Sequence, residues 1–229
     1  MDMKKYKFLL FDVDGTLLDF HAAENQALLR TFQMYHIPFH NHIKDIYEEI
    51  NHRLWKSFEQ GLIDKETVLF TRFDELFERL NIHQDGIQFE IDYQKELGKG
   101  HQLLPYALDI VKDLSQKYHL YIVTNGVSST QYSRLQMSGL DQYFIDIFVS
   151  EDAGYQKPAK EYFDYCFQRI DGFDKEHALI IGDSLSSDIL GGIHAGIDTC
   201  WIHDTTSCEK EIQPTYSITD LRQIYDILK

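Results

Sequence analysis

The sequence has few cysteines, no long hydrophobic run and a shortage of positive charge. Its three cysteines, Cys166, Cys200 and Cys208, have no paired spacing and form no CxxC motif. A sparse, odd set argues against a disulfide framework or a cysteine zinc site and predicts reduced thiols in a cytoplasmic protein. No apolar stretch reaches transmembrane length, and the apolar run near the N-terminus is too short and too acidic at its end for a signal peptide. We therefore expect no membrane association.

Basic residues are outnumbered, because 22 Lys and Arg face 37 Asp and Glu and the formal net charge is −15. Such a surface repels phosphate backbones, so we expect no binding to long nucleic acids. A small phosphorylated ligand remains compatible, since it needs only a local positive pocket and a metal. His36, His40 and His42 lie near the start of a predicted helix. No Cys or second acidic partner accompanies them, so we interpret them as ordinary loop histidines.

Repeats, low-complexity tracts and Gly/Ser linkers are absent from the sequence. Instead, two kinds of segment alternate, one typical of strands and the other of helices. Short apolar runs bounded by Asp, Gly, Asn or Lys are typical of buried parallel strands. Helical patterns over residues 104–118 and 158–170, each with a Pro near its start, lie between them. The alternation predicts an α/β fold, a Rossmann-like doubly wound parallel sheet with sites at the carboxyl ends of its strands. The expected strands are residues 7–12, 119–124, 146–150, 178–183 and 198–202.

Residues 18–98 contain several helical patterns and almost no strand-like segment, and Gly61 and Asn81 are typical of helix ends. We predict two domains, an α/β core of residues 1–17 and 99–229 and an inserted all-helical domain of residues 18–98. The apolar stripes of the insert indicate helix packing, and its functional interpretation is a lid over the acidic loop after the first strand. The stripes are Leu28, Phe32 and Tyr35; Ile46, Ile50, Leu54 and Phe58; and Leu69, Phe73, Leu76, Phe77 and Leu80.

The first predicted strand leads into an acidic loop, Asp12-Val13-Asp14-Gly15-Thr16. Alternate residues of a strand share a face, so Asp12 and Asp14 can both face one pocket. Gly15 lets the backbone turn without a Cβ clash. Two carboxylates at such a place favour a metal-assisted nucleophile. The alternative is an Asp-rich turn with no catalytic role. The polar residues that follow the other predicted strands argue against this alternative.

Two further strand ends carry groups suited to a phosphorylated ligand. Thr124-Asn125-Gly126 ends one apolar run and offers a hydroxyl and an amide just before a helix start. Together with backbone N–H groups, they can hold phosphate oxygens. Lys157 stands just before Pro158 and the next predicted helix, where a cation can neutralise the charge of a phosphoryl group and a nucleophile.

A fourth strand end is acidic again. The run Leu179-Ile180-Ile181-Gly182 leads into a strand-to-helix turn that contains Asp183 and Asp188. Oxygen ligands from Asp12, Asp183 and the Asp14 carbonyl would suit Mg²⁺, which also takes a phosphate oxygen. The sequence therefore predicts a magnesium-assisted phosphoryl-transfer site.

In this order, DxDGT, TNG, Lys-Pro and GDSxxxD resemble the four motifs of the haloacid dehalogenase-like superfamily. The motifs extend from residue 12 to residue 188, and the helical insert stands where that family has its cap, so the resemblance covers the whole chain. It implies a parallel sheet whose first strand is flanked by the second and fourth. Residues 12, 124 and 183 would then meet despite their separation in sequence.

The resemblance also implies a role for each motif residue. Asp12 would be the nucleophile that forms an aspartyl-phosphate, and Asp14 would protonate the leaving alkoxide and then activate water. Thr124 and Asn125 would bind phosphoryl oxygens. Lys157 would fix Asp12 and neutralise phosphate charge. The implied Mg²⁺ site comprises Asp12, Asp14, Asp183 and, in direct contact or one ligand removed, Asp188.

Asp14 separates branches of the superfamily. Haloacid dehalogenases lack a carboxylate at this position because a halide needs no acid, and transport ATPases of the superfamily carry Thr there. Asp14 therefore implies a poor alkoxide leaving group and hence phosphatase or phosphomutase chemistry. No catalytic position is replaced, which argues against the third possibility, a non-catalytic ligand-binding protein.

Residues 51–55, 151–158 and 182–189 resemble the bacterial pyrimidine 5'-nucleotidase group. This implies a Mg²⁺-dependent hydrolase of (deoxy)pyrimidine nucleoside monophosphates. The sequence leaves open whether the protein is a monomer or a homodimer. A sugar-phosphate phosphatase and a β-phosphoglucomutase-like phosphomutase, which returns the phosphoryl group to its substrate, are the alternatives.

Phe20, Trp55 and Arg72 are candidates within the insert to contact a base. Their structural alternatives are a hinge contact, a place in the core of the insert and an ion pair, respectively. Asp19 is expected to cap the first helix of the insert or to shape the hinge rather than to take part in the chemistry.

Overall fold

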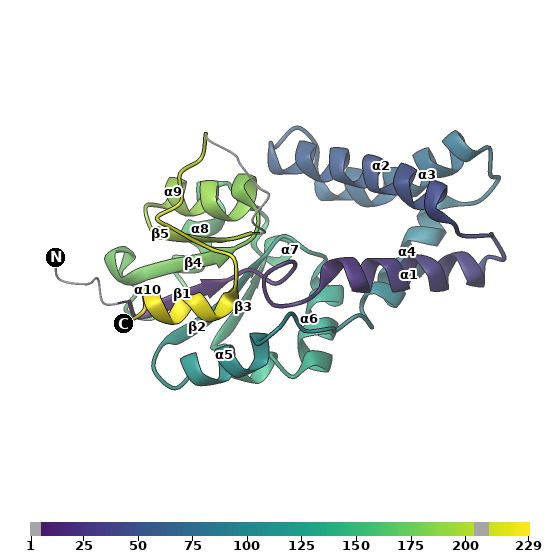
Figure 1. Ribbon diagram of the computed structural model, residues 1–229. Helices are drawn as coiled ribbons and strands as arrows, with labels where there is room; N and C mark the ends of the chain where they lie inside the picture. The colour runs from purple at the N-terminus through teal and green to yellow at the C-terminus, as the bar shows by residue number, and fades with distance from the viewer. Residues whose placement is uncertain (1–5, 204–210) are drawn as a thin grey trace. The chain divides into compact units, whose positions relative to one another are not determined.

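The computed structural model describes residues 6–203 and 211–229, and Cys208 lies outside them. The chain divides into two compact units (Figure 1). One unit comprises the chain up to Phe20 together with His101–Lys229, and the other is His21–Gly100. The sequence-based limits of the insert lie at residues 18 and 98. Cys166 and Cys200 are buried free thiols, and no helix of the described chain has the length and hydropathy needed to cross a membrane.

A parallel sheet forms the first unit and confirms the predicted α/β fold. Its order within the described chain is β3-β2-β1-β4-β5-β6, so β1 is flanked by β2 and β4. Phe11 is in register with Ile122 on one side and with Ile181 on the other. The carboxyl ends of these three strands therefore coincide. The strands are β1(Phe8–Phe11), β2(His119–Thr124), β3(Asp146–Val149), β4(Ala178–Gly182), β5(Asp198–Ile202) and β6(Tyr216–Ile218).

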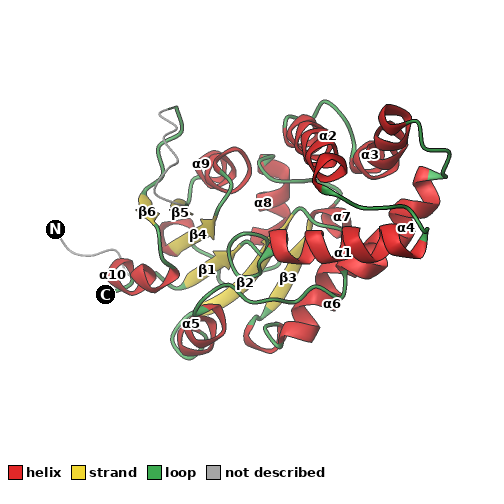
Figure 2. Cartoon of the chain, turned by 45° about the vertical axis from the view of Figure 1, so that its right-hand side comes forward, coloured by secondary structure: helices red, strands yellow, loops and turns green. Residues whose placement is uncertain are grey.

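Side chains alternate between the two faces of this sheet, and each face has its own apolar cluster. Leu9 and Phe11 belong to the cluster that includes α5(Ala107–Leu114) and α10(Ile224–Ile227). Phe8 and Leu10 belong to the cluster that includes α8(Lys160–Phe167) and α9(Leu190–Ala195). Figure 2 shows these helix pairs on opposite sides of the strands. The central strands are buried on both faces, which explains why their sequences are continuously apolar.

Several predicted elements of this unit differ from the observed ones. The predicted helix over residues 104–118 is shorter, because Tyr106 has a positive φ of 67° and α5 begins only after it. The predicted helix over residues 158–170 is limited to α8, so Ile170 packs from outside it. The strand β6 was not predicted, because its three residues are too few to show a period. The remaining elements of this unit are α6(Ser128–Ser138), α7(Ser150–Ala153), the short helical turns η1(Asp141–Tyr143), η2(Lys175–His177) and η4(Leu221–Gln223), and the π-helical turn η3(Leu185–Ile189).

The inserted unit is built from helices, as predicted. Asp64 and Asp85 cap two of them through backbone N–H groups of Thr67 and Gln88. Asn81 ends α3 in the left-handed conformation with φ 53°. Ile46 and Leu69 of the predicted stripes are half-buried. The helices are α1(Phe20–Met34), α2(Asn41–Glu59), α3(Lys65–Leu80) and α4(Gly86–Leu97).

Candidate active site

The carboxyl end of β1 presents Asp12 in the middle of the sheet. Its backbone N–H donates to the Ile181 carbonyl at 2.9 Å, which continues the β1–β4 pairing by one residue. The side chain of Asp12 is buried, and its Oδ1 accepts a hydrogen bond from Lys157 Nζ at 2.7 Å. An anion at this depth requires such a cationic partner.

Lys157 is the cationic centre of the site. Besides Asp12, its Nζ donates to Asp188 Oδ1 at 2.6 Å and to the Val123 carbonyl at 2.8 Å, so all three ammonium hydrogens have acceptors. The amide of Asn125 holds the backbone of Lys157 at both ends. Asn125 Oδ1 accepts from Lys157 N and Asn125 Nδ2 donates to Lys157 O, each at 2.9 Å. The side chain predicted to bind phosphate thus positions the lysine.

Three carboxylates converge beside this lysine. Oxygens of Asp12, Asp183 and Asp188 all lie within 4.8 Å of one another. Asp12 and Asp188 are buried, whereas Asp183 is exposed and its carboxylate accepts no hydrogen bond from the described part of the chain. Oxygen donors alone, with one carboxylate open to solvent, fit a hard cation such as Mg²⁺ that retains water. Asp14 does not belong to this side-chain cluster.

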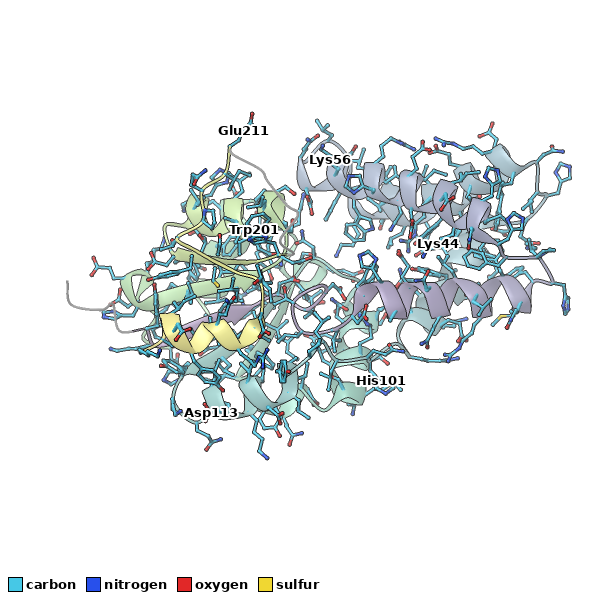
Figure 3. All side chains as sticks on the ribbon, viewed as in Figure 1. Lys44, Lys56, His101, Asp113, Trp201 and Glu211 are labelled. Carbon is cyan, nitrogen blue, oxygen red and sulfur yellow. The ribbon has the colours of Figure 1, made fainter. Side chains whose placement is uncertain are left out.

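The carboxylate of Asp183 lies so close to Gly15 that no larger residue fits at position 15. Gly15 has a φ of +77°, and a Cβ placed there would lie 2.2 Å from Asp183 Oδ2. The glycine of the DxDGT motif is therefore required both by the turn and by the carboxylate. Trp201 of β5 is labelled in Figure 3. Its indole Nε1 donates to the Asp183 carbonyl at 2.8 Å. This bond restrains the backbone that carries Asp183.

The charges of the site perturb its ionisation. Burial is the main reason why the pKa of Asp12 is raised to about 7. The negative charges of Asp188 and Asp14 also raise this pKa, and the positive charge of Lys157 lowers it only in part. Burial alone would lower the pKa of Lys157, but the neighbouring Asp12 and Asp188 carboxylates raise it above its usual value. The site therefore has more negative charge than its lysine can neutralise.

Without a divalent cation, the stability of the protein is expected to fall as the pH rises from about 5 to about 8. The folded pKa of Asp12 exceeds its unfolded value of about 4, so the folded state binds more protons in this window and loses that advantage as the proton leaves. Lys157 contributes no slope there, because it stays charged. Mg²⁺ should raise the melting temperature by several degrees, and more at pH 8 than at pH 6, because bound carboxylates are deprotonated.

Thermal melts at both pH values, with EDTA and with Mg²⁺, measure this effect. The matched variant Asp12→Asn should lose part of the difference between the two pH values, because desolvation also raises the pKa of the neighbouring Asp183. Asp109→Asn, on the exposed side of α5, should behave like wild type. A Mg²⁺-induced shift that is equal at both pH values and in all variants would contradict a metal site at these carboxylates.

Asp14 and Thr124 meet the helix that follows β2. Gln131 Nε2 donates to Asp14 Oδ2 at 2.9 Å and to Thr124 Oγ1 at 2.7 Å. Arg134 NH1 donates to Asp14 Oδ1, and Gln131 Oε1 accepts from the same guanidinium at 3.0 Å. Sequence reasoning missed Gln131 and Arg134. The available signal was their spacing of three residues, which places them on one face of a helix directly after the TNG motif.

The insert holds two of the three candidate base contacts. Arg72 is fully buried and forms a two-point ion pair with Glu90, at 2.7 Å and 2.6 Å. Its NH1 also donates to Asn51 Oδ1 at 2.9 Å, so the geometry favours the ion-pair interpretation. Trp55 is half-buried and packs edge-on against Phe58.

The remaining sequence candidates lie elsewhere. Phe20, the first residue of α1, is half-buried, and its ring lies 5.8 Å from the Arg134 guanidinium. Asp19 immediately precedes it. His40 and His42 stack on each other with ring centroids 6.3 Å apart. No third ligand accompanies them, since the Asp12 cluster is the one group of metal-ligating side chains in the described ranges.

The geometry agrees with comparisons to known proteins. The profile of the haloacid dehalogenase-like hydrolase family matches residues 6–196. The HAD-hydrolase YfnB of Bacillus subtilis is 52% identical over 227 residues, covering 99% of this chain and 97% of that protein. The pyrimidine 5'-nucleotidase PynA of Streptococcus pneumoniae is 40% identical, with coverage of 97% and 95%. The pyrimidine 5'-nucleotidase YjjG of Escherichia coli is 32% identical, with coverage of 98% of each chain.

A solved structure shares the whole fold. The crystal structure of YfnB, described as bound to magnesium, superposes with a TM-score of 0.94 at 51% identity and covers 99% of this chain and 100% of that one.

Proposed function

The chain belongs to the haloacid dehalogenase-like hydrolases, and from this premise we propose that it is a Mg²⁺-dependent phosphomonoesterase acting on pyrimidine nucleoside 5'-monophosphates. The observation that carries the proposal is the buried Lys157 ammonium, which joins Asp12 to Asp188 beside the exposed carboxylate of Asp183. A carboxylate nucleophile, a fixed cation and open oxygen ligands are the components that phosphoryl transfer requires.

In the proposed first step, an oxygen of Asp12 attacks phosphorus and the bond from phosphorus to the leaving oxygen breaks. Asp14 gives that oxygen its proton, so the nucleoside leaves as an alcohol. In the second step, water attacks the aspartyl-phosphate, Asp14 takes a proton from the water, and inorganic phosphate is released while Asp12 is restored. Lys157 neutralises the charge around Asp12 in both steps.

The remaining residues support these steps. Thr124 lies at the end of β2, where its hydroxyl would contact a phosphoryl oxygen, and the Asn125 amide keeps Lys157 in place. Bound Mg²⁺, held by Asp12, Asp183, the Asp14 carbonyl and Asp188 directly or through another ligand, would offset phosphoryl charge. The family structure with magnesium supports this assignment.

The proposed substrate class rests on the relatives. Two proteins that match nearly the whole chain at 40% and 32% identity are named as pyrimidine 5'-nucleotidases. We place the enzyme in the cytoplasm, where its few cysteines remain reduced. Its substrates would be single nucleotides, because the acidic chain repels a polyanion.

Phosphate release with Mg²⁺ from a panel of nucleotides and sugar phosphates is the deciding experiment. We expect pyrimidine monophosphates such as UMP, dUMP and dTMP to be turned over at least about tenfold more efficiently than purine nucleotides or sugar phosphates, which corresponds to roughly 1.4 kcal/mol of differential transition-state binding. EDTA should abolish the release.

Other outcomes would contradict the proposal in defined ways. Best turnover of sugar phosphates would retain the chemistry and reject the nucleotide specificity. Conversion of a sugar phosphate to its isomer without phosphate release would indicate a phosphomutase. Phosphate release that survives exhaustive chelation would reject the metal.

A further inference from the structure

Two buried polar side chains of α6 hold the carboxylate of Asp14. Gln131 and Arg134 are each 1% exposed, although both are long and polar. Gln131 contacts Asp14 Oδ2 and Arg134 contacts Asp14 Oδ1. Each carboxylate oxygen therefore has its own N–H donor, and one of the donors is charged. A two-point hold restricts both the position and the rotation of the carboxylate plane.

Gln131 also connects Asp14 to Thr124. Its Oε1 accepts from Arg134, which directs its Nε2 towards Asp14 and Thr124. Thr124 Oγ1 accepts this bond and a second one from Gly126 N at 3.2 Å. With both lone pairs engaged by N–H donors, the hydroxyl hydrogen of Thr124 is left to be donated. A phosphoryl oxygen is the acceptor that the proposed reaction brings there.

Gly126 and Phe20 are close neighbours of these two side chains. A Cβ at Gly126 would lie 2.6 Å from the side chain of Gln131, so the glycine of the TNG motif makes the space that Gln131 fills. On the other side, the ring of Phe20 lies 5.8 Å from the Arg134 guanidinium, within the range of a cation–π contact.

We propose that Gln131 and Arg134 are positioning residues of the reaction, which hold Asp14 in line for proton transfer and orient the Thr124 hydroxyl towards the phosphoryl group. This rests on the proposed phosphomonoesterase activity. General acid catalysis depends on the distance and direction from the acid to the leaving oxygen. Loss of the contacts from Gln131 and Arg134 to Asp14 should therefore lower the rate most for substrates whose leaving group needs a proton.

The test compares two leaving groups. Arg134→Gln and Gln131→Met are expected to lower kcat by about 10- to 100-fold for the best alkyl phosphate of the panel. They should lower kcat by less than about threefold for p-nitrophenyl phosphate, whose phenolate leaves without a proton. KM should change little. Arg134→Lys, which keeps the charge and one donor, should recover part of the rate and serves as the second variant if Arg134→Gln fails to fold.

A double-mutant cycle with Asp14→Asn isolates the contact. In that background, Arg134→Gln is expected to have no further effect on alkyl phosphate turnover. The melting temperatures should also be non-additive by several degrees, a readout that needs no activity. The matched controls Arg169→Gln and Gln142→Met, both exposed in the same unit, should behave like wild type.

Several results would overturn the assignment. Equal losses on both leaving groups, or additive effects with Asp14→Asn, would show that the two residues do not act through Asp14. A raised KM with unchanged kcat would make Arg134 a direct ligand of the phosphoryl group. If the wild-type enzyme is active and the effects of Arg134→Gln and Asp14→Asn are additive, the positioning role is refuted and the proposed function is not. Wild-type protein that releases phosphate from no monoester refutes the proposed function and the role of the pair within it.

Discussion

Replacing Asp12 by Asn is expected to lower phosphate release by at least about 10⁴-fold while the protein remains folded. The amide oxygen of Asn is too weak a nucleophile to form the aspartyl-phosphate, and Asp188 is left as the one carboxylate that pairs with Lys157 in the described chain. Initial rates on the best substrate of the panel measure the loss, and circular dichroism with a thermal melt establishes the fold. Because ionised Asp12 is disfavoured by burial, the Asn variant should melt no lower than wild type at pH 8 without metal.

Two further measurements make this result specific. Radiolabelled substrate followed by an acid quench should leave label on the wild-type protein and none on Asp12→Asn. The control Asp109→Asn removes a carboxylate from an exposed position of α5 and should retain full turnover. Substantial turnover by the Asp12→Asn variant would exclude Asp12 as the nucleophile and reopen the mechanism.

Replacing Lys157 by Met is expected to lower kcat by about 10³-fold or more and to destabilise the fold by about 3 kcal/mol. The ammonium donates to three acceptors in the interior, and its loss leaves Asp12 and Asp188 as buried anions without their cation. Methionine has nearly the same length, so the change removes charge and donors rather than volume. Urea unfolding and initial rates measure the two effects.

The control for this variant is Lys160→Met, three residues further along the chain. Lys160 is exposed at the start of α8 and pairs with Asp164 on the surface, so its loss should change stability by less than about 1 kcal/mol. Mg²⁺ should restore part of the stability of Lys157→Met, because the ion neutralises the same carboxylates. An unchanged rate in Lys157→Met would contradict the role of Lys157 in the proposed reaction.

The sequence predicted the central sheet because its strands are buried on both faces. Runs such as Phe8-Leu9-Leu10-Phe11 must be apolar at every position, and that pattern is visible without coordinates. The polar residues after β1, β2 and β4 were visible for the same reason, since they follow an apolar run directly, whereas α7 separates Lys157 from β3. β6 escaped prediction because three residues at the edge of the sheet carry too little pattern.

Gln131 and Arg134 illustrate what a linear pattern cannot show. They stand on a helix among other polar residues, where a sequence reader assigns such side chains to solvent. Their partner Asp14 is 117 residues from Gln131 and 120 residues from Arg134. Only the parallel packing of β1 beside β2 brings the two regions together, and it turns this face of α6 towards the acidic loop.

Arg72 makes the same point within the insert. The helical spacing was compatible with a base contact or an ion pair, and the sequence could not decide between them. Glu90, 18 residues away on another helix, accepts from both Nε and NH2 along one edge of the guanidinium. Which partner a buried arginine finds depends on how helices pack, because the cost of burying its charge is met by whichever carboxylate lies closest.

We could infer the alternation of strands and helices, the helical insert and the types of the motif residues from the sequence, because burial and turn chemistry act on neighbouring residues. Which of those residues share a hydrogen bond follows from the packing of distant segments. That packing assigned the Asn125 amide to the Lys157 backbone, left the Asp183 carboxylate open to solvent and placed Gln131 between Asp14 and Thr124. Such contacts depend on distances of a few ångströms between segments that are far apart in the sequence. Those distances are set only when the strands have paired in their native register.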